Sequence, residues 1–265
     1  MLAPAPTIHL QSVEKVFPNG VRGLAPLDLA VGQGELVSLI GPSGCGKSTL
    51  LKLIANLHQP SGGAVRWWGE DFSAIGREGR RLSFVFQDPT LMPWSNVATN
   101  VRLPLDLDGV PRAQAEARIM PALRQVGLEH AAKRYPAQLS GGMRMRVSIA
   151  RALVTRPDLL LMDEPFGALD EFTRNRLDED MARLCARDGL TTIFVTHSLY
   201  EAAFLSSRVI VMAADPGRIH AEYVIDPGMP RDEAFRMSDA FARICRDLTA
   251  LLSEVSPRRA GEEGI

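Results

Sequence analysis

Apolar residues recur along the chain in short runs whose period changes from that of a strand to that of a helix. The first part reads as three strands, at 7–17, 27–31 and 35–40, with glycines marking the turn before the third. Behind a glycine-rich loop, residues 47–57 have apolar positions three and four apart, and this spacing predicts a helix.

The alternation of the two periods continues through most of the remaining chain. It predicts five further strands, at 64–68, 82–86, 159–162, 192–196 and 209–213, of which the last ends the core. It predicts three further helices, over 112–127, 141–155 and 172–187. Strands that alternate with helices indicate an α/β fold with a parallel sheet.

This pattern suggests how the chain is divided. We expect one α/β domain over 7–224, with a helical insertion at about 88–155 whose first part is broken by prolines. Residues 225–255 are expected to form a C-terminal helical extension, in which 231–254 has the spacing of one amphipathic helix. Residues 256–265 are expected to be a disordered tail.

Composition narrows the class of protein. The 265 residues carry a formal net charge of −1, which indicates neither nucleic acid nor an anionic membrane surface as a binding partner. Three scattered cysteines suggest neither a disulfide framework nor a structural zinc site. The start lacks the features of a signal peptide, and no apolar run reaches the ~18–20 residues of a spanning helix. Any membrane role is therefore expected to need a partner.

The glycine-rich loop has the form G-x-x-x-x-G-K-[ST]. Its residues are Gly41, Pro42, Ser43, Gly44, Cys45, Gly46, Lys47, Ser48 and Thr49. Between a strand and a helix, such a loop points backbone N–H groups at phosphate oxygens, while its lysine reaches the β- and γ-phosphates and its serine a magnesium ion. The alternative, a glycine-rich turn by chance, does not explain the flanking strand and helix. We read Cys45 as a small residue that fits the loop, not as a redox group.

Four polar residues follow strands whose carboxyl ends should share one edge of the sheet. Asp163 and Glu164 end the strand at 159–162, Gln87 follows 82–86, and His197 follows 192–196. Asp163 is suited to hold magnesium and Glu164 to accept a proton from the attacking water, with Gln87 near metal and water and His197 near the γ-phosphate. Taken alone, two acids at a strand end would more often be solvated and have no catalytic role. The glycine-rich loop of residues 41–49, the phosphate cradle, makes a catalytic role the better interpretation.

A second glycine pair opens the helix at 141–155. Ser140 is predicted to cap this helix, and Gly141 and Gly142 leave bare amides at its start, which makes a second anion site. One nucleotide does not need two phosphate sites in one chain. Two chains placed head to tail would let each such site face the other chain's cradle.

Along the chain, five motifs follow one another: the glycine-rich loop, Gln87, the segment from Ser140 to Met143, Asp163 with Glu164, and His197. Their order resembles that of the ATP-binding cassette (ABC) ATPases, and the resemblance covers residues 8–219. The resemblance implies a P-loop NTPase parallel sheet core, an N-terminal antiparallel β subdomain and a helical insertion subdomain. It implies a head-to-tail homodimer with two ATP molecules, each bound by one chain's cradle and the other's Ser140 and Gly142. It further implies that Phe17 stacks on adenine, that Ala168 to Asp170 lie across the dimer interface, and that the Gln87 loop and the insertion receive a membrane permease.

Two departures and several local segments point to a narrower branch. Met143 stands where the family usually has glutamine, and Phe17 where it usually has tyrosine. Segments 91–94, 139–144, 204–208 and 216–218 resemble the nitrate, sulfonate and taurine importers, while 167–174 and 196–198 resemble members that carry pyrimidine or thiamine precursors. The resemblance implies a bacterial importer, at the cytoplasmic face of the inner membrane, working with permease subunits and a substrate-binding protein.

Three other classes of ATP-binding cassette protein fit the sequence less well. Repair or translation cassettes usually carry two cassettes or a long coiled-coil insertion, and this chain has neither. A regulator that binds ATP without hydrolysing it does not need Glu164 and His197. An exporter cassette is disfavoured by the importer-like segments.

Overall fold

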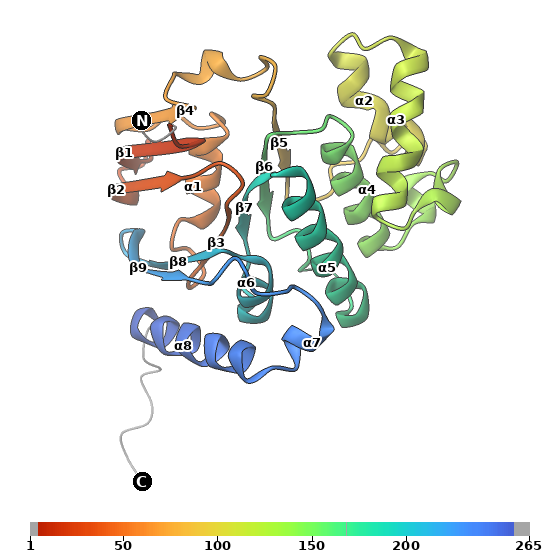
Figure 1. The fold of residues 1–265 in the computed structure, drawn as a ribbon. Coiled ribbons are helices and arrows are strands. Elements are labelled where there is room, and N and C mark those ends of the chain that lie inside the picture. The colour runs from red at the N-terminus through yellow and green to blue at the C-terminus, as the bar shows by residue number, and fades with distance from the viewer. Residues whose placement is uncertain (1–4, 168, 257–265) are drawn as a thin grey trace.

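The computed structural model describes residues 5–167 and 169–256, which form two sheets with helices around them (Figure 1). The smaller sheet is antiparallel, in the order β2-β1-β4. Its strands are β1 (Ile8–Val16), β2 (Arg22–Val31) and β4 (Gly62–Trp67). Trp67 fixes this sheet to the first helix, because its buried Nε1 donates to the Ile54 carbonyl at 2.9 Å.

The larger sheet has six strands in the order β5-β6-β7-β3-β8-β9. They are β3 (Leu36–Ile40), β5 (Leu82–Val85), β6 (Leu159–Asp163), β7 (Thr191–Val195), β8 (Arg208–Ala213) and β9 (Arg218–Val224). The first five strands of that order are parallel, as predicted, and β9 pairs antiparallel with β8. The prediction that 209–213 would be the last strand was therefore wrong. β9 is an edge strand with half its residues exposed, so its sequence lacks the apolar run of a central strand.

Central strands are apolar throughout because both faces of the sheet are covered. Every residue of β3, β6 and β7 is buried. Alternate residues belong to two hydrophobic clusters: Val37, Leu159 and Leu161 join the one that contains the small sheet and α1 (Lys47–Ile54). Leu36 and Leu160 join the other, on the face covered by α5 (Glu171–Asp188) and α6 (Leu199–Leu205).

The insertion contains α2 (Val97–Leu107), α3 (Arg112–Gln125) and α4 (Gly141–Leu153). Helix α2 was missed, because Pro104 inside it reads as a helix breaker. The helix is stabilised at its start by Asn96, whose side chain accepts from Thr99 N at 2.8 Å. Three short 3₁₀ helices complete the chain's helical structure as described: η1 (Phe72–Ala74), η2 (Glu129–Ala131) and η3 (Pro136–Gln138).

The C-terminal segment forms two helices, α7 (Glu233–Arg236) and α8 (Asp239–Val255), so the prediction of one helix over 231–254 was wrong. Ser238 separates them: its hydroxyl donates to the Phe235 carbonyl at 2.7 Å and accepts from Phe241 N at 3.2 Å. Helix α8 packs against α6, β8 and β9. Helix α6 was also missed, because it is only seven residues long. Of the predicted tail, 257–265 lie outside the described residues.

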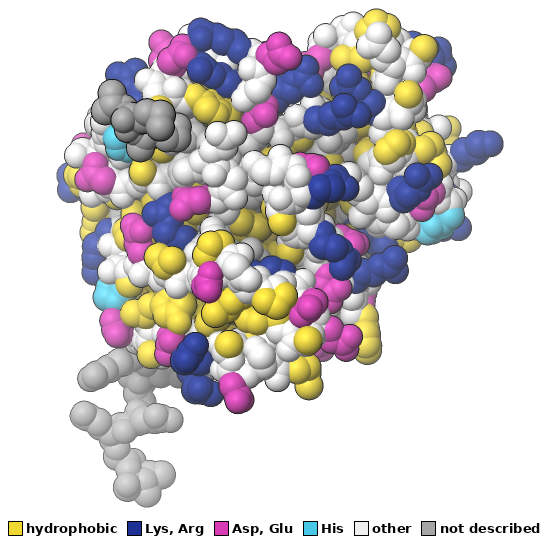
Figure 2. All heavy atoms as spheres, in the orientation of Figure 1, with side chains coloured by type: hydrophobic (Ala, Val, Ile, Leu, Met, Phe, Trp, Pro, Cys, Tyr) yellow, Lys and Arg dark blue, Asp and Glu magenta, His cyan; other side chains and the backbone are white. Residues whose placement is uncertain are grey.

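The surface has no dominant charge. Figure 2 shows basic and acidic side chains interspersed over the visible face, in keeping with the formal net charge of −1. Within 5–167 and 169–256, no helix has the length and apolar character needed to cross a bilayer.

Candidate nucleotide site

The glycine-rich loop leaves the carboxyl end of β3 and runs into α1. Gly41 has φ +150°, and a side chain there would collide with the Met212 carbonyl and with Cys45 Sγ. Gly46, with φ +94°, is the N-cap of α1 and leaves its first amides free of side-chain caps. The loop is therefore a turn whose backbone donors stay available to an anion.

Lys47 points back over this loop. Its Nζ donates to the Gly41 carbonyl at 2.9 Å and the Pro42 carbonyl at 3.1 Å, and the residue is only 7% exposed. The buried Cys45 Sγ lies 3.7 Å from the same nitrogen. Nearly buried ammonium groups normally pair with an acid, but Lys47 is held in this structure by carbonyl oxygens and a thiol. A phosphate would supply the missing negative charge.

Two oxygen ligands face each other beside the loop. Ser48, in the first turn of α1, donates its hydroxyl to Asp163 Oδ1 at 2.9 Å. Asp163 ends β6 and is 5% exposed, and burial raises the pKa of its carboxyl although the Ser48 hydroxyl opposes that shift. A hydroxyl and a carboxylate fit magnesium, and the cation would offset the burial of the charge. No group of three or more acid, histidine or cysteine ligands occurs among the described residues, so phosphate and water would complete such a shell.

Glu164, Gln87 and His197 converge next to Asp163. Gln87 Nε2 donates to Glu164 Oε2 at 3.3 Å, and His197 Nδ1 lies 3.5 Å from the same oxygen. The Glu164 backbone is left-handed, with φ +47°, and its N–H donates to the Val195 carbonyl at 2.9 Å. Strand pairing thus fixes the main chain while the carboxylate stays 25% exposed, which leaves it accessible to water.

The predicted second anion site is separate from this cluster. Ser140 caps α4 by accepting from Met143 N at 3.2 Å. Helix α4 packs against α2, α3 and β5, whereas α1 packs against β2, β6 and β7 (Figure 1). Gly142, beside Gly141, contacts Leu169, since a Cβ at Gly142 would lie 2.8 Å from Leu169 Cδ2. One chain therefore does not bring its two phosphate sites together.

Two other predicted residues lie at the margins of the site. Phe17 is half-buried: its ring lies against Gly23 and edge-on to His58, with centroids 6.3 Å apart, and Lys15 Nζ lies over it at 5.8 Å from the centroid. Asp170 caps α5 by accepting from Thr173 N at 3.0 Å, and this bond and that from the Thr173 side chain lower the pKa of its carboxyl. Ala168, predicted in the same loop, lies outside the described residues.

Sequence reasoning missed three polar residues behind the cluster: Thr196 and Glu201, which are buried, and Arg174, which is half-buried. Glu201 is 4% exposed and lies on α6, four residues after His197. The available signal was an acid on the apolar face of a segment rich in alanine and phenylalanine, which calls for a buried partner.

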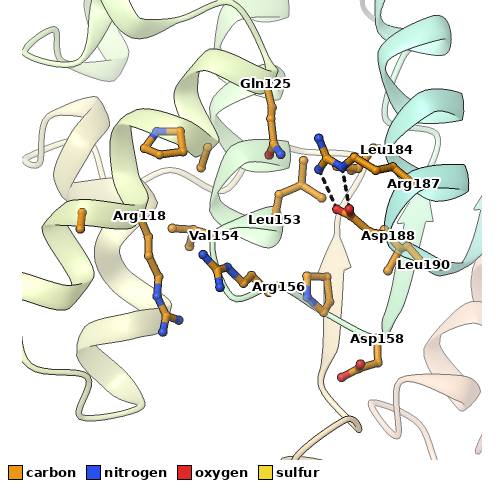
Figure 3. A pocket seen from close by; sticks show the side chains of 14 residues that line it. Arg118, Gln125, Leu153, Val154, Arg156, Asp158, Leu184, Arg187, Asp188 and Leu190 are labelled. Atoms are coloured by element: carbon orange, nitrogen blue, oxygen red, sulfur yellow. Dashed lines mark hydrogen bonds and ion pairs between the residues drawn. The ribbon is translucent and has the colours of Figure 1, made fainter.

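The described residues also enclose a cavity of about 570 Å³ at the opposite edge of the sheet, near the start of β6. Arg118 on α3, Arg156 before β6 and Asp188 at the end of α5 line it (Figure 3). Arg187 donates two hydrogen bonds to Asp188 there, at 2.6 and 2.8 Å. This cavity shares no residue with the glycine-rich loop.

Comparison with known proteins places this geometry in a family. A model of the ABC transporter family matches residues 24–167. The bicarbonate transport ATP-binding protein CmpC of Synechococcus elongatus is 44% identical over 231 residues, which cover 84% of this chain and 34% of that protein. The chain thus spans about a third of the length of that relative.

Two further likenesses cover most of both chains. The taurine import ATP-binding protein TauB of Chromobacterium violaceum is 47% identical over 193 residues, 73% of each chain. The solved ATP-binding cassette MJ0796, described as a dimer in a post-hydrolysis state bound to ADP and phosphate, is 32% identical with a TM-score of 0.75, and covers 82% of this chain and 98% of its own. This chain belongs to the ABC transporter family, as one of its ATP-binding cassettes.

Proposed function

We propose that this cassette binds and hydrolyses MgATP as a homodimer and energises import of a small solute through separate membrane subunits. The observation that carries the proposal is the convergence of Gln87 and His197 on the Glu164 carboxylate, next to the Ser48–Asp163 pair. A base, two side chains that can bind a metal ion and a phosphate cradle, all at one edge of the sheet, are the parts that ATP hydrolysis requires.

Each chain would bind one nucleotide along this edge. Phe17 stacks on the base, the amides of 41–49 and Lys47 hold the phosphates, and Ser48, Gln87 and Asp163 hold magnesium. The metal, when bound, neutralises charge on the β- and γ-phosphates. The buried position of Lys47 supports this role, because the hydrogen-bond partners of its Nζ within the described residues are two carbonyl oxygens and a thiol.

Hydrolysis then needs one proton transfer. Water attacks the γ-phosphorus while the bond to the β,γ-bridging oxygen breaks, and Glu164 takes the proton that the water loses. His197 and Lys47 stabilise charge on the γ-phosphate oxygens, and Gln87 positions the water. The products are ADP and inorganic phosphate.

A head-to-tail dimer would complete each site. Ser140, Gly141 and Gly142 would contact the γ-phosphate held by the partner, with Asp170 beside it. The separation of this anion site from α1 within one chain supports that arrangement, as does the dimeric solved cassette at 32% identity.

The names of the relatives support a proposal for the cargo and the partners. Curated relatives at 42–47% identity are called bicarbonate transport, nitrate import and taurine import proteins. These names favour a small anionic or sulfonated solute over a pyrimidine or thiamine precursor. Permease subunits would dock on the Gln87 loop and the helical insertion, with the cassette on the cytoplasmic face of a bacterial inner membrane and a binding protein on the other side.

The test compares wild type and Glu164→Gln by ATPase rate and by molecular size with and without MgATP. We expect the variant to bind ATP, to dimerise on it, and to hydrolyse it ~10²–10⁴-fold more slowly. Lys47→Ala is the matched control, since it should lose ATP binding and therefore dimerisation. A Glu164→Gln protein that turns over ATP at the wild-type rate would refute the base assignment; one that binds ATP but stays monomeric would refute the shared site.

A further inference from the structure

A half-buried arginine, Arg174, contacts both the loop that follows Glu164 and the helix that follows the His197 loop. Arg174, on α5, donates from Nη2 to the Leu169 carbonyl at 2.7 Å and from Nε to the Phe166 carbonyl at 3.4 Å. Its Nε also lies 3.3 Å from Glu201 Oε1 on α6. One planar guanidinium therefore holds both ends of the loop that follows Glu164 and reaches across to the next helix.

Glu201 connects Arg174 to the loop that contains His197. Its other oxygen, Oε2, accepts a hydrogen bond from the Thr196 hydroxyl, and that hydroxyl accepts from Ser198 N at 2.9 Å. The two ends of this contact therefore bracket His197. Glu201 is 4% exposed, and burial raises the pKa of its carboxyl against the opposing effects of Thr196 and Arg174. A carboxylate so placed depends on both partners to stay charged.

The connection extends at both ends to residues of the proposed ATP site. Leu169, whose carbonyl Arg174 holds, packs on Gly142 at the start of α4. Gly167 lies against the His197 ring, because a Cβ at Gly167 would be 3.5 Å from His197 Cε1. A continuous path therefore runs from Gly142 through Leu169, Arg174 and Glu201 to the loop that carries His197.

We propose that Arg174 and Glu201 are positioning residues. They hold the start of α4, which would contact the partner's nucleotide, in a fixed position relative to the His197 loop, which would contact the chain's own nucleotide. The proposal rests on the head-to-tail dimer proposed above, in which Gly142 serves one ATP and His197 the other. A shift of the Leu169 loop on dimer closure would then move His197 toward its phosphate, so that the two sites of a dimer respond to each other.

The test separates this role from simple stabilisation. Glu201→Gln removes one charge at constant size, and Arg174→Gln removes one charge together with the guanidinium. Arg183→Gln is the control for the arginine change, since Arg183 lies on the same helix in an exposed pair with Asp180. Hydrogen exchange of the nucleotide-free chain is followed in two segments, 164–171 and 195–199. We expect Glu201→Gln to speed exchange in 164–171, which Glu201 does not bond, and Arg174→Gln to speed it in 195–199. The control should leave both segments unchanged.

Turnover gives a second readout. Both variants should hydrolyse ATP at least about tenfold more slowly, while ATP affinity measured on the single chain stays within about twofold, because neither residue touches the cradle. Arg174→Lys, which keeps the charge but not the planar fork, should recover part of the rate. If a variant fails to fold, Thr196→Val takes its place, since it removes only the hydroxyl between Glu201 and Ser198.

The outcomes distinguish the two proposals. Exchange that rises only in the segment next to each substitution, with unchanged turnover, overturns the positioning role. A wild type that does not hydrolyse ATP overturns the proposed function, and the exchange results still decide whether the two loops are coupled.

Discussion

Gly41 is where the cradle leaves the least freedom to a single residue. Its φ of +150° is open to glycine, and the space that a Cβ would occupy is taken by the Met212 carbonyl on β8. Gly44 also has a positive φ, +79°, but nothing lies within 4 Å of the position of its Cβ. Two glycines of one motif thus serve different needs, close approach to a neighbouring strand at Gly41 and backbone conformation alone at Gly44.

This difference predicts unequal effects on nucleotide binding. Gly41→Ala should weaken ATP binding at least about tenfold, because backbone of the loop or of β8 must move. Gly44→Ala should lower the free energy of unfolding by about 1–3 kcal/mol through backbone strain, with a smaller effect on affinity. Titration of ATP onto each variant, together with thermal unfolding, measures both quantities. Equal affinities for the two variants would contradict the steric argument.

At the scale of elements, local signals predicted most strands and failed where a tertiary contact outweighs them. The strands 35–40 and 159–162 were found because burial on both faces makes them apolar throughout. Helix α2 was missed because Pro104 argues against a helix. The sequence does not show that Asn100, which stabilises this helix, is buried. The C-terminal break was missed because Ser238 lies within an apolar periodicity that continues on both sides.

The side chain of Asn100 joins α2 to the loop after Gln87. Its Nδ2 donates to the carbonyls of Met92, Ser95 and Asn96 at 2.9–3.1 Å, and its Oδ1 accepts from Met92 N at 2.7 Å. Asn100→Ala should lower the free energy of unfolding by about 1–3 kcal/mol for each buried group left unpaired. Asn96→Ala, which loses one helix cap, should cost about 1 kcal/mol. Urea unfolding of both checks the order, and a larger effect at Asn96 would refute this account.

Helix α7 is attached through an ion pair that should respond to pH. Arg236 Nη2 lies 3.0 Å from Asp178 Oδ2, and burial raises the pKa of Asp178 to about 7 although the Arg236 hydrogen bond opposes the shift. The folded pKa exceeds the unfolded value near 3.8, so the folded state binds this proton more tightly. The stability that Asp178 contributes is complete below pH ~4 and is lost as pH rises toward 7.

The corresponding experiment measures the free energy of unfolding of wild type and Asp178→Asn between pH 4 and 8. Asparagine cannot titrate, so the stability of the variant relative to wild type should increase across this range by as much as about 4 kcal/mol. A constant offset reflects the changed contact with Arg236, and only the slope tests the pKa. Parallel curves would show that Asp178 is charged throughout.

At the scale of the whole molecule, the sequence was most informative about the edge of the sheet where strands end. Lys47, Ser48, Gln87, Asp163, Glu164 and His197 were each predicted there, and the structure brings them together. Their roles remain proposals. The network behind them was not predicted, since Arg174 and Glu201 are 27 residues apart in the sequence and meet only once α5 and α6 pack.

The proposed division of the chain can be tested at residue 226. Phe235, Phe241, Ile244 and Leu248 of α7 and α8 are buried in the same cluster as Phe204 of α6. Burying such side chains stabilises a fold by roughly 1.5–3 kcal/mol each. A chain ending at Asp226 should therefore unfold at lower temperature and aggregate, as measured by calorimetry and light scattering. If the shortened chain is as stable as the full one, 225–255 is an independent appendage.

The left-handed backbone of Glu164 would link the proposed catalytic base to the integrity of the sheet. A glutamate at φ +47° lies in a conformation that an isolated peptide avoids, and the bond from its N–H to the Val195 carbonyl holds it there. Because this bond joins Glu164 to the end of β7, we expect Glu164 to leave this conformation as soon as β6 and β7 begin to separate. On heating, the ATPase activity should then be lost at a lower temperature than the temperature of global unfolding. Loss of activity would be the earliest sign of thermal damage to this molecule.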